Sequence, residues 1–358
     1  MSTLSPRLSA RSAVTHMFAE VGVRLGETEE ADIIMTDAAY PRFLEGGLGI
    51  GESYQAGLWR EGRMSIRDFS VARIKGRMLD MPHNPDASEQ SIENSPTVAR
   101  LHYDAGNEYY ARILDPMYMQ YSCADYSAGA TSIDEAQVQK LYRTGSSQSL
   151  HEGDSVLDIG SGFGGLLRFY NERWGTRGTG ITLSAKQLEF AKRLNSGRPN
   201  EFLLQDYRLL DGQFDRLVSV GMFEHVGSSH RRTFFERCKR LLKPRGNMRL
   251  QSIFGVFRGG ADPWLAEHIF PGGDLPLRRD VEADISGLFS ATEWYRMGKN
   301  YERTLMAWNH NLRQQWDVLL ALGYDEHFLR TQDYYQHDCA ARFACGIITV
   351  YQVQLEHA

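Results

Sequence analysis

The stretch 155–165, SVLDIGSGFGG, is the part of the sequence that decides the fold. It begins with a short apolar run that only Asp158 interrupts, and glycines follow at Gly160, Gly162 and Gly164. A buried strand that enters a glycine turn and then a helix suits a nucleotide-type cofactor, because bare backbone approaches the ligand and the helix N-terminus offers unpaired N–H groups. Any tight strand–helix turn also favours glycine, so the motif alone leaves both interpretations open.

Strand-like and helix-like segments alternate around this stretch. Strands are expected at 156–160, 179–182, 202–205, 216–220 and 248–253, and helices at 164–174, 185–194 and 228–242. This alternation predicts an α/β fold, a doubly wound and mostly parallel sheet with helices on both faces. Ligands bind such a sheet at the carboxyl ends of its strands, which here carry 160–164, 182–183, 206–207 and 221–224.

The residues at these strand ends narrow the choice of ligand. Thr182 stands where a dinucleotide site usually has an acid, which counts against NAD. Ser184 and Gln187 have the spacing of a capping box, and Asp206 could be a turn or cap residue. Glu224 follows the buried run FDRLVSV almost directly, so it either caps the next helix or faces a ligand. Because the run places Glu224 at the edge of the sheet where ligands bind, a role toward a ligand is favoured over helix capping.

The length of 358 residues predicts two domains, or one large core with an appendage. A small, mostly helical domain is expected over 1–90, followed by a catalytic domain over 91–358. The Pro-, Asn- and Ser-rich text at 80–95 is typical of a linker. Within the small domain, the glycines at 46–51 predict a loop or tight turn, and Tyr54, Leu58 and Trp59 are expected on one helix face. Later in the chain, one long helix is expected over 301–322 and a closing strand over 347–355.

Composition and charge restrict the partners. The formal net charge of −5 argues against nucleic acid as a partner, and no run has the length of a membrane span or of a secretory signal core. The basic region 230–245 is either a solvated helix face or a contact for anionic lipid headgroups. Neither metal-ligand spacing nor a disulfide framework is visible, so we expect a cytoplasmic chain with reduced thiols and no metal. The four cysteines are Cys123, Cys238, Cys339 and Cys345.

Six segments together resemble the cyclopropane-fatty-acid synthases. They are HYDAGNEYY…LDPMYMQYSCADY, VLDIGSGFGGL, GITLSAKQ, LLQDYR, FDRLVSVGMFEHVG and NYERTLMAW. The resemblance runs from about Ala31 almost to the last residue, so it includes the small N-terminal domain. It implies a Rossmann-like class I fold and a methylene transfer from S-adenosylmethionine to the cis double bond of a phospholipid acyl chain. It also implies an unsaturated phospholipid partner and a peripheral place on the inner membrane surface, and a homodimer stays open.

The resemblance also implies two sets of site residues. The cofactor set is Tyr121, Ser122, Asp158, Gly160, Ser161, Gly162, Thr182, Leu183, Gln187, Asp206 and Tyr207. The catalytic set, which in the family holds a bicarbonate base, is Cys123, Glu224, Gln251, Ile253 and Tyr301. Cys339 matches a family cysteine once regarded as a nucleophile, although a buried core thiol is the stronger interpretation. The insertion at 254–288 is expected to cover the substrate, since its Trp264, Ile269 and Phe270 suit an acyl chain as well as ordinary packing.

Gln251 departs from the family, which has histidine at this position. Its amide donates a hydrogen bond to an anion but never carries positive charge, so bicarbonate affinity would fall if the histidine is cationic. Two products therefore stay open, a cyclopropane made with weaker bicarbonate binding, or a methyl-branched or methylene lipid from a longer-lived carbocation. A catalytically silent lipid- or cofactor-binding protein is the third alternative. The presence of Cys123, Glu224 and Tyr301 argues against it.

Overall fold

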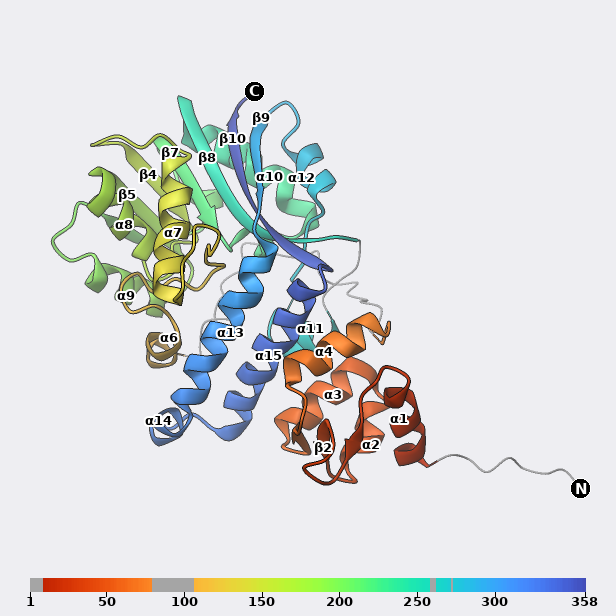
Figure 1. Ribbon diagram of the computed structural model, residues 1–358. Coiled ribbons are helices and arrows are strands. Elements are labelled where there is room, and N and C mark those ends of the chain that lie inside the picture. The colour runs from red at the N-terminus through yellow and green to blue at the C-terminus, as the bar shows by residue number, and fades with distance from the viewer. Residues whose placement is uncertain (1–8, 79–105, 258–261, 272) are drawn as a thin grey trace, which may run out of the picture.

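The computed structural model describes residues 9–78, 106–257, 262–271 and 273–358. A seven-stranded sheet with its helices forms one end of the molecule, and the N-terminal helices form the other (Figure 1). The expected linker at 80–95, and with it the boundary near residue 90, lies outside the described ranges.

The large sheet has the strand order β6-β5-β4-β7-β8-β10-β9. β10 runs opposite to the other six strands of this sheet, so the predicted mostly parallel sheet is confirmed. All five predicted strands form, and β8 begins six residues earlier than the predicted strand. The strands are β4 (Ser155–Ile159), β5 (Arg177–Thr182), β6 (Glu201–Leu204), β7 (Phe214–Val220), β8 (Leu242–Gly255), β9 (Phe289–Arg296) and β10 (Ile348–His357).

Helices cover both faces of this sheet, as a doubly wound fold requires. Successive residues of β4 show it, because Val156 packs into a cluster with α7 and α8, while Leu157 packs into another with α10 and α12. Both side chains are fully buried. This alternation is the period-two pattern of a strand between two helical layers. The helices and turns of this region are α6 (Asn107–Ile113), α7 (Ile133–Ser146), α8 (Gly165–Trp174), α9 (Ala185–Leu194), η1 (Tyr207–Leu209), η2 (Phe223–His225), η3 (Ser228–His230), α10 (Arg231–Leu241) and α12 (Arg278–Asp284).

Two long helices, α13 (Gly298–Gln314) and α15 (Glu326–Ala344), lie side by side between the sheet and the N-terminal helices (Figure 1). The predicted single helix over 301–322 is wrong in extent, because the chain breaks at Gln315 and resumes as α14 (Trp316–Ala321). The N–H of Gln315 is shared between the carbonyls of Asn311 and Leu312, a three-centre bond common at helix ends.

The N-terminal region combines four helices with a small three-stranded sheet, among the residues described. Its elements are α1 (Ala10–Ala19), β1 (Leu25–Gly26), β2 (Ile33–Met35), α2 (Ala39–Phe43), α3 (Gly46–Gln55), β3 (Trp59–Glu61) and α4 (Ile66–Lys75). Its core is continuous with that of the long helices, since Phe69 and Trp59 belong to the same buried cluster as Trp308 of α13 and Tyr334 of α15. The region is therefore packed onto the wall that α13 and α15 form.

The glycine-rich segment 46–51 corrects the sequence prediction, because it forms the first half of α3 and not a loop. The glycines serve close packing. A Cβ on Gly51 would lie 2.4 Å from the ring of Trp264, and one on Gly49 would lie 2.0 Å from the carbonyl oxygen of Arg42. The predicted helix face of Tyr54, Leu58 and Trp59 is also wrong, because α3 ends at Gln55, Leu58 follows it outside the helix and Trp59 lies in β3. Tertiary contact thus overrides the low helix propensity of glycine here.

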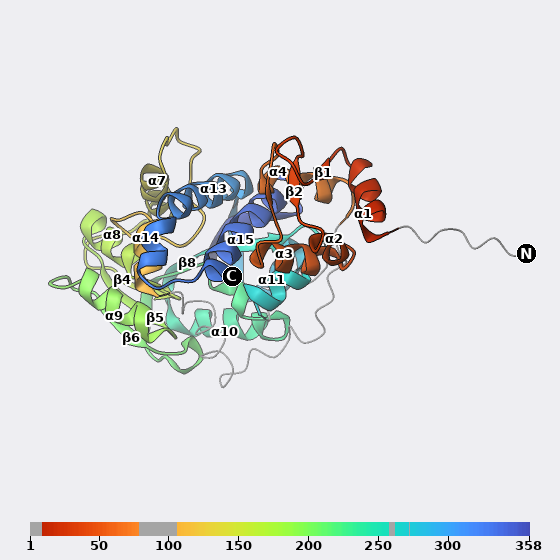
Figure 2. The same ribbon diagram turned by 90° about the horizontal axis from the view of Figure 1, so that it is seen from below.

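The insertion before β9 contributes the short helix α11 (Pro263–His268), which lies against α3 (Figure 2). Trp264 is buried there, with its ring edge-on to Tyr334 and its Nε1–H donated to Gln55 at 3.0 Å. Through this side chain, the insertion is joined to both the N-terminal region and α15.

Candidate active site

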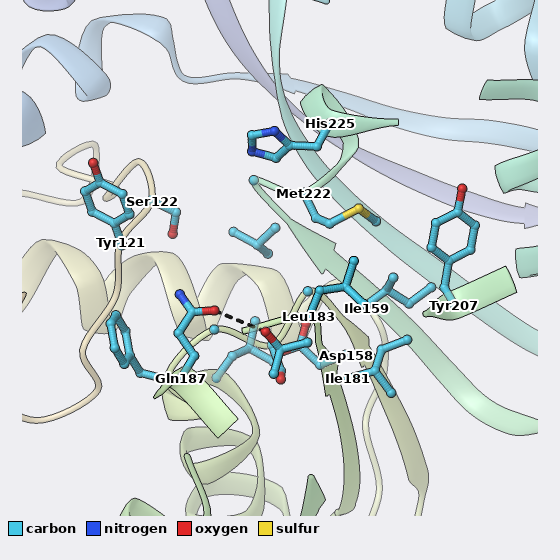
Figure 3. A pocket seen from close by; sticks show the side chains of 18 of the residues that line it. Tyr121, Ser122, Asp158, Ile159, Ile181, Leu183, Gln187, Tyr207, Met222 and His225 are labelled. Atoms are coloured by element: carbon cyan, nitrogen blue, oxygen red, sulfur yellow. Dashed lines mark hydrogen bonds between the residues drawn. The ribbon is translucent and has the colours of Figure 1, made fainter. Parts of the chain in front are cut away.

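A cavity opens at the carboxyl ends of β4 to β7, where the topology predicts a ligand. We call it the strand-end cavity; it is lined by residues 119–122, 158–163, 181–183, 205–208 and 220–222, with Leu166, Gln187, His225 and Val226. All eleven predicted cofactor residues belong to this lining. Tyr121 and Ser122 approach from one side and Tyr207 and Met222 from the other (Figure 3). The predicted cofactor residues thus lie on one continuous surface. The binding role of each of these residues stays a prediction.

The glycine turn gives this cavity a wall of bare backbone. Gly160 has φ +85° and Gly162 has φ +51°, in the left-handed region that other residues rarely adopt. A Cβ on Gly160 would lie 2.7 Å from the Met222 side chain, whereas a Cβ on Gly162 would meet nothing within 4 Å. Gly162 lines the cavity, so its backbone is open to a ligand at this point.

The polar residues at the ends of β5 and β6 already have partners. Ser184 caps α9 as expected, but the Gln187 side chain does not return to the cap; its oxygen accepts from Thr182 Oγ1 at 3.1 Å (Figure 3). A bond from Gln187 to a cofactor would therefore use its N–H donors. Asp206 caps η1 and holds Arg208 Nη2 at 2.6 Å.

Helix α7 supports the segment 119–123, and sequence reasoning missed this support. Lys140 is fully buried and donates to Ser122 Oγ at 3.0 Å and to Gln120. Gln137 Nε2 donates to the Ser122 carbonyl at 2.9 Å. Burial lowers the pKa of Lys140 to about 8 and raises the pKa of Asp158 to about 7, and the Lys140 charge opposes the second shift. The sequence feature that could have indicated this support is the pair Gln137 and Lys140, two polar residues on the buried face of α7.

A second cavity, mainly apolar, adjoins the first. We call it the apolar cavity; its aliphatic and aromatic lining includes Leu265, Ile269, Phe270, Leu275, Leu305, Tyr335, Phe343, Ile348 and Val350. The predicted insertion residues Ile269 and Phe270 line it, whereas Trp264 is packed behind them. The two cavities share the wall formed by Tyr121, Ser122, Gly221 and His225. His225, which follows Glu224, was missing from the predicted site.

All five residues predicted to hold an anion line the apolar cavity, and Cys339 lines it as well. Glu224 Oε1 accepts the Ile253 N–H at 2.7 Å. Glu224 Oε2 is buried and has no hydrogen-bond partner within the described part of the chain. Burial raises the pKa of Glu224 to about 7, although the Ile253 bond works in the opposite direction. A carboxyl group with one unused oxygen therefore faces a largely apolar space.

Gln251 and Tyr301 belong to the same predicted set. Gln251 Nε2 donates to the Cys123 carbonyl at 3.3 Å. Tyr301 lies against the Phe343 ring at a centroid distance of 4.7 Å, and burial raises its pKa well above the ordinary value. Burial likewise raises the pKa of the Cys123 and Cys339 thiols. All four cysteines have free thiols, and a neutral thiol is a poor nucleophile, so a packing role suits Cys339 better than covalent catalysis.

Most of the basic region 230–245 is engaged within the fold. Arg231 pairs with Asp274 and Asp284, and Lys243 pairs with Asp215. Arg232, Arg237 and Lys239 also donate to acidic or carbonyl groups of the chain. Contact of this region with lipid headgroups stays a prediction, and these pairings leave it fewer free charges than the sequence suggests.

Among the described residues, one group has metal-ligand geometry. Glu52, Glu267 and His268 have ligand atoms within 4.8 Å of one another, but Glu52 is already bound by Arg42. No helix in the described parts of the chain combines the length and apolarity needed to cross a bilayer.

Comparison with known proteins agrees with this geometry. The family model for mycolic acid cyclopropane synthetase matches residues 90–353. The chain is 37% identical over 350 residues to the cyclopropane-fatty-acyl-phospholipid synthase of Escherichia coli K12, covering 94% of this chain and 91% of the relative. It is 31% identical to the tuberculostearic acid methyltransferase UfaA1 of Mycobacterium tuberculosis, over 86% and 78% of the two chains. The solved mycolic acid cyclopropane synthase CmaA1, complexed with SAH and CTAB, superposes with a TM-score of 0.68 at 29% identity, over 73% and 97% of the chains.

Proposed function

We propose that this chain cyclopropanates the cis-unsaturated acyl chains of membrane phospholipids. It belongs to the mycolic acid cyclopropane synthetase family and is an S-adenosylmethionine-dependent methyltransferase. One observation carries the proposal. The strand-end cavity and the apolar cavity meet at the wall of Tyr121, Ser122, Gly221 and His225. A cofactor on one side and an alkene on the other would thus be held in the contact that methyl transfer requires.

The residues of the strand-end cavity fit the cofactor. Gly162 presents bare backbone, and helix α8 begins at the same turn with its N–H groups, which suits a nucleoside with a carboxylate tail. When bound, S-adenosylmethionine supplies an electrophilic methyl group on a sulfonium. Lys140 and Gln137 hold Ser122 and its neighbours in place, so the wall between the cavities is fixed before substrate arrives.

The residues of the apolar cavity would guide the alkene. An apolar lining excludes water, which would otherwise trap the carbocation that follows methyl transfer. The rings of Tyr301, Tyr335 and Phe343 offer their π-electrons to that cation. Glu224 and Gln251 would suit a bicarbonate ion, since the unused Glu224 oxygen could accept the bicarbonate O–H, or donate to it when protonated, and the second N–H of the Gln251 amide could donate another bond. When bound, bicarbonate supplies the base that removes a proton for ring closure.

Access to such a substrate requires contact with a bilayer. We propose a transient, peripheral contact at a cytoplasmic membrane surface, because the apolar cavity suits an acyl chain that must leave the bilayer. The phospholipid would bind with its chain in this cavity and its headgroup outside.

Gln251 supports a second candidate, a methyl-branched or methylene lipid as product. Its neutral amide binds an anionic base less firmly than a charged imidazole would, so the cation lives longer before deprotonation. A hydride shift or loss of a different proton would then compete with ring closure. One relative carries the name tuberculostearic acid methyltransferase, and this chain is 31% identical to it.

The test uses the full chain with methyl-labelled S-adenosylmethionine and vesicles of dioleoyl phosphatidylglycerol and phosphatidylethanolamine. We expect label in the acyl chains and cyclopropane proton resonances in place of olefinic ones. Methyl or methylene resonances would establish the second candidate. Vesicles of the corresponding saturated lipids are the control, and equal labelling of both vesicle types would contradict alkene alkylation.

A further inference from the structure

We propose that Arg249 and Gln352 are positioning residues that fix the Gln251 amide with its N–H donors toward the apolar cavity. The inference rests on the proposed function, in which Gln251 donates to bicarbonate. Gln251 on β8 and Gln352 on β10 are directly opposite each other in the sheet. Gln251 Oε1 accepts from Gln352 Nε2 at 2.8 Å, and Gln352 Oε1 accepts from Arg249 Nη2 at 3.0 Å. The three side chains form one continuous relay behind the cavity.

The polarity of this relay is set by its first member. A guanidinium has donors and no acceptor, so the Gln352 atom that faces Arg249 must be the oxygen. The Gln352 nitrogen therefore faces Gln251, and the Gln251 atom that receives its hydrogen bond must be the oxygen. The Gln251 nitrogen is then left for the other side, where one of its N–H groups donates to the Cys123 carbonyl. Both Gln251 and Cys123 are among the residues that line the apolar cavity.

Thr144 fixes the same orientation independently. Its hydroxyl donates to the Lys140 carbonyl at 2.6 Å, so its oxygen can only accept. Gln352 Nε2 donates to that oxygen at 2.9 Å, which again requires the nitrogen of Gln352 on this side. Two neighbours of Gln352, one that only donates and one that only accepts, thus agree on one arrangement of its amide.

Arg249 is an energetically unfavourable residue at this buried position. Its side chain is fully buried, with one ion pair to Glu293 at 2.6 Å and with no hydrogen-bond partner for its Nε within the described residues. Burying a charge in a sheet costs free energy that an apolar residue would save. In a low-dielectric interior, however, a cation at the start of a hydrogen-bond chain strengthens the donors that follow. Arg249 therefore both orients and polarises the Gln251 N–H that a neutral amide presents to an anion.

A merely structural relay would tie β8 to β10 without regard to donor direction, and Gln352→Glu separates the two roles. The carboxylate still accepts from Arg249 but cannot donate to Gln251. The Gln251 amide must then turn its nitrogen toward position 352 and its carbonyl oxygen toward the cavity, where it repels an anion. Adding Gln251→His restores a donor, because an imidazolium donates one N–H to the carboxylate and the other to the cavity.

The experiment measures turnover on the unsaturated vesicles against bicarbonate concentration in carbonate-depleted buffer. The variants are Gln352→Glu, Gln251→His, the double variant and Gln336→Glu, which adds a buried carboxylate on α15 at a position that lines neither cavity. We expect Gln352→Glu to weaken the apparent bicarbonate affinity about tenfold or more, and the double variant to recover it to within about threefold. S-adenosylhomocysteine affinity, measured by calorimetry, should stay unchanged in all four variants, and Gln336→Glu should keep its bicarbonate response.

An unchanged bicarbonate affinity in Gln352→Glu would overturn the relay, and so would a loss that Gln251→His does not recover. The failure of the proposed function has a different signature in the same assay. A wild-type protein that alkylates lipid without any bicarbonate response would remove the anion and the relay together, and one that transfers no methyl group to lipid would remove the function itself.

Discussion

The strand-end cavity and the apolar cavity lie side by side but are built in opposite ways. The first lies at the ends of successive strands around the glycine turn, so most of its lining falls within residues 158–226. The second collects side chains from residue 110 to residue 350, and they come from the insertion, α13, α15 and β10 as well as from the strand ends. A cofactor site of this kind can be recognised from a few sequence motifs, whereas a substrate site depends on how elements distant in the sequence pack together.

The two cavities also differ in electrostatics. In the strand-end cavity the polar groups at the ends of β5 and β6 have partners, as Asp206 has in Arg208 and Thr182 has in Gln187. In the apolar cavity, Glu224 retains an unpartnered oxygen and a raised pKa. The strand-end cavity also holds a carboxyl group, Asp158, whose pKa burial raises to about 7, so the difference lies in the mainly apolar lining around Glu224. Substitutions in the two cavities should therefore separate cofactor binding from turnover.

The largest effect is expected for Glu224→Gln. The amide keeps the shape of the side chain but cannot carry the negative charge beside the sulfonium and the developing cation, so turnover on unsaturated vesicles should fall about 1,000-fold. Affinity for S-adenosylhomocysteine, measured by calorimetry, should stay within about twofold, because Glu224 does not line the strand-end cavity. Glu282→Gln, on the exposed face of α12, is the matched control and should retain wild-type turnover. Equal losses of turnover and of cofactor affinity in Glu224→Gln would contradict the separate roles of the two cavities.

The difference in stability between Glu224→Gln and the wild-type protein should depend on pH. The pKa of Glu224 rises from its ordinary value of 4.5 to about 7 on folding, so the native state holds a proton that the unfolded state has lost. Between these two values the wild-type free energy of unfolding falls as pH rises, and Gln at this position removes that loss. The stability of Glu224→Gln relative to wild type should therefore increase by roughly 2 to 3 kcal/mol from pH 5 to pH 8. Denaturant unfolding at the two pH values measures it, and a difference that does not change with pH would refute the burial of an ionisable carboxyl here.

Gly162→Ala should affect the strand-end cavity alone. Both Gly162 and Gly197 have positive φ and open space at the Cβ position, but only Gly162 lines the cavity. Each alanine variant should lose about 1 kcal/mol of stability from backbone strain. Only Gly162→Ala should also lose about tenfold in S-adenosylhomocysteine affinity, since its methyl group occupies cofactor space. If Gly197→Ala weakened binding as much, strain and not occupancy would be the cause.

Cys339→Ala should have the smallest effect. Burial raises the pKa of this thiol, so it remains protonated at neutral pH and is not available as a thiolate. Turnover should stay within about threefold of wild type, because only a few packing contacts at the apolar cavity are lost. A loss approaching that of Glu224→Gln would restore covalent catalysis as an explanation.

The difference between the cavities also explains what the sequence could predict. The run 155–165 specifies its strand, turn and helix through neighbours in the chain, and the predicted cofactor residues accordingly fall on one surface. The glycines of α3 could not be interpreted in that way, because the Trp264 ring that requires Gly51 lies more than 200 residues away. Likewise, Gln251 is recognisable as a departure from the family, but its partner Gln352 is 101 residues distant and becomes its neighbour only through the pairing of β8 and β10.

A crystal structure with S-adenosylhomocysteine and a cis-unsaturated phospholipid tests the central claim most directly. We expect the cofactor sulfur at the wall of Tyr121, Ser122, Gly221 and His225, with the middle of the acyl chain across it in the apolar cavity and the Glu224 carboxyl group beside both. A nucleoside bound away from the glycine turn would contradict it, as would an acyl chain outside the apolar cavity or a Glu224 side chain turned away from the sulfur.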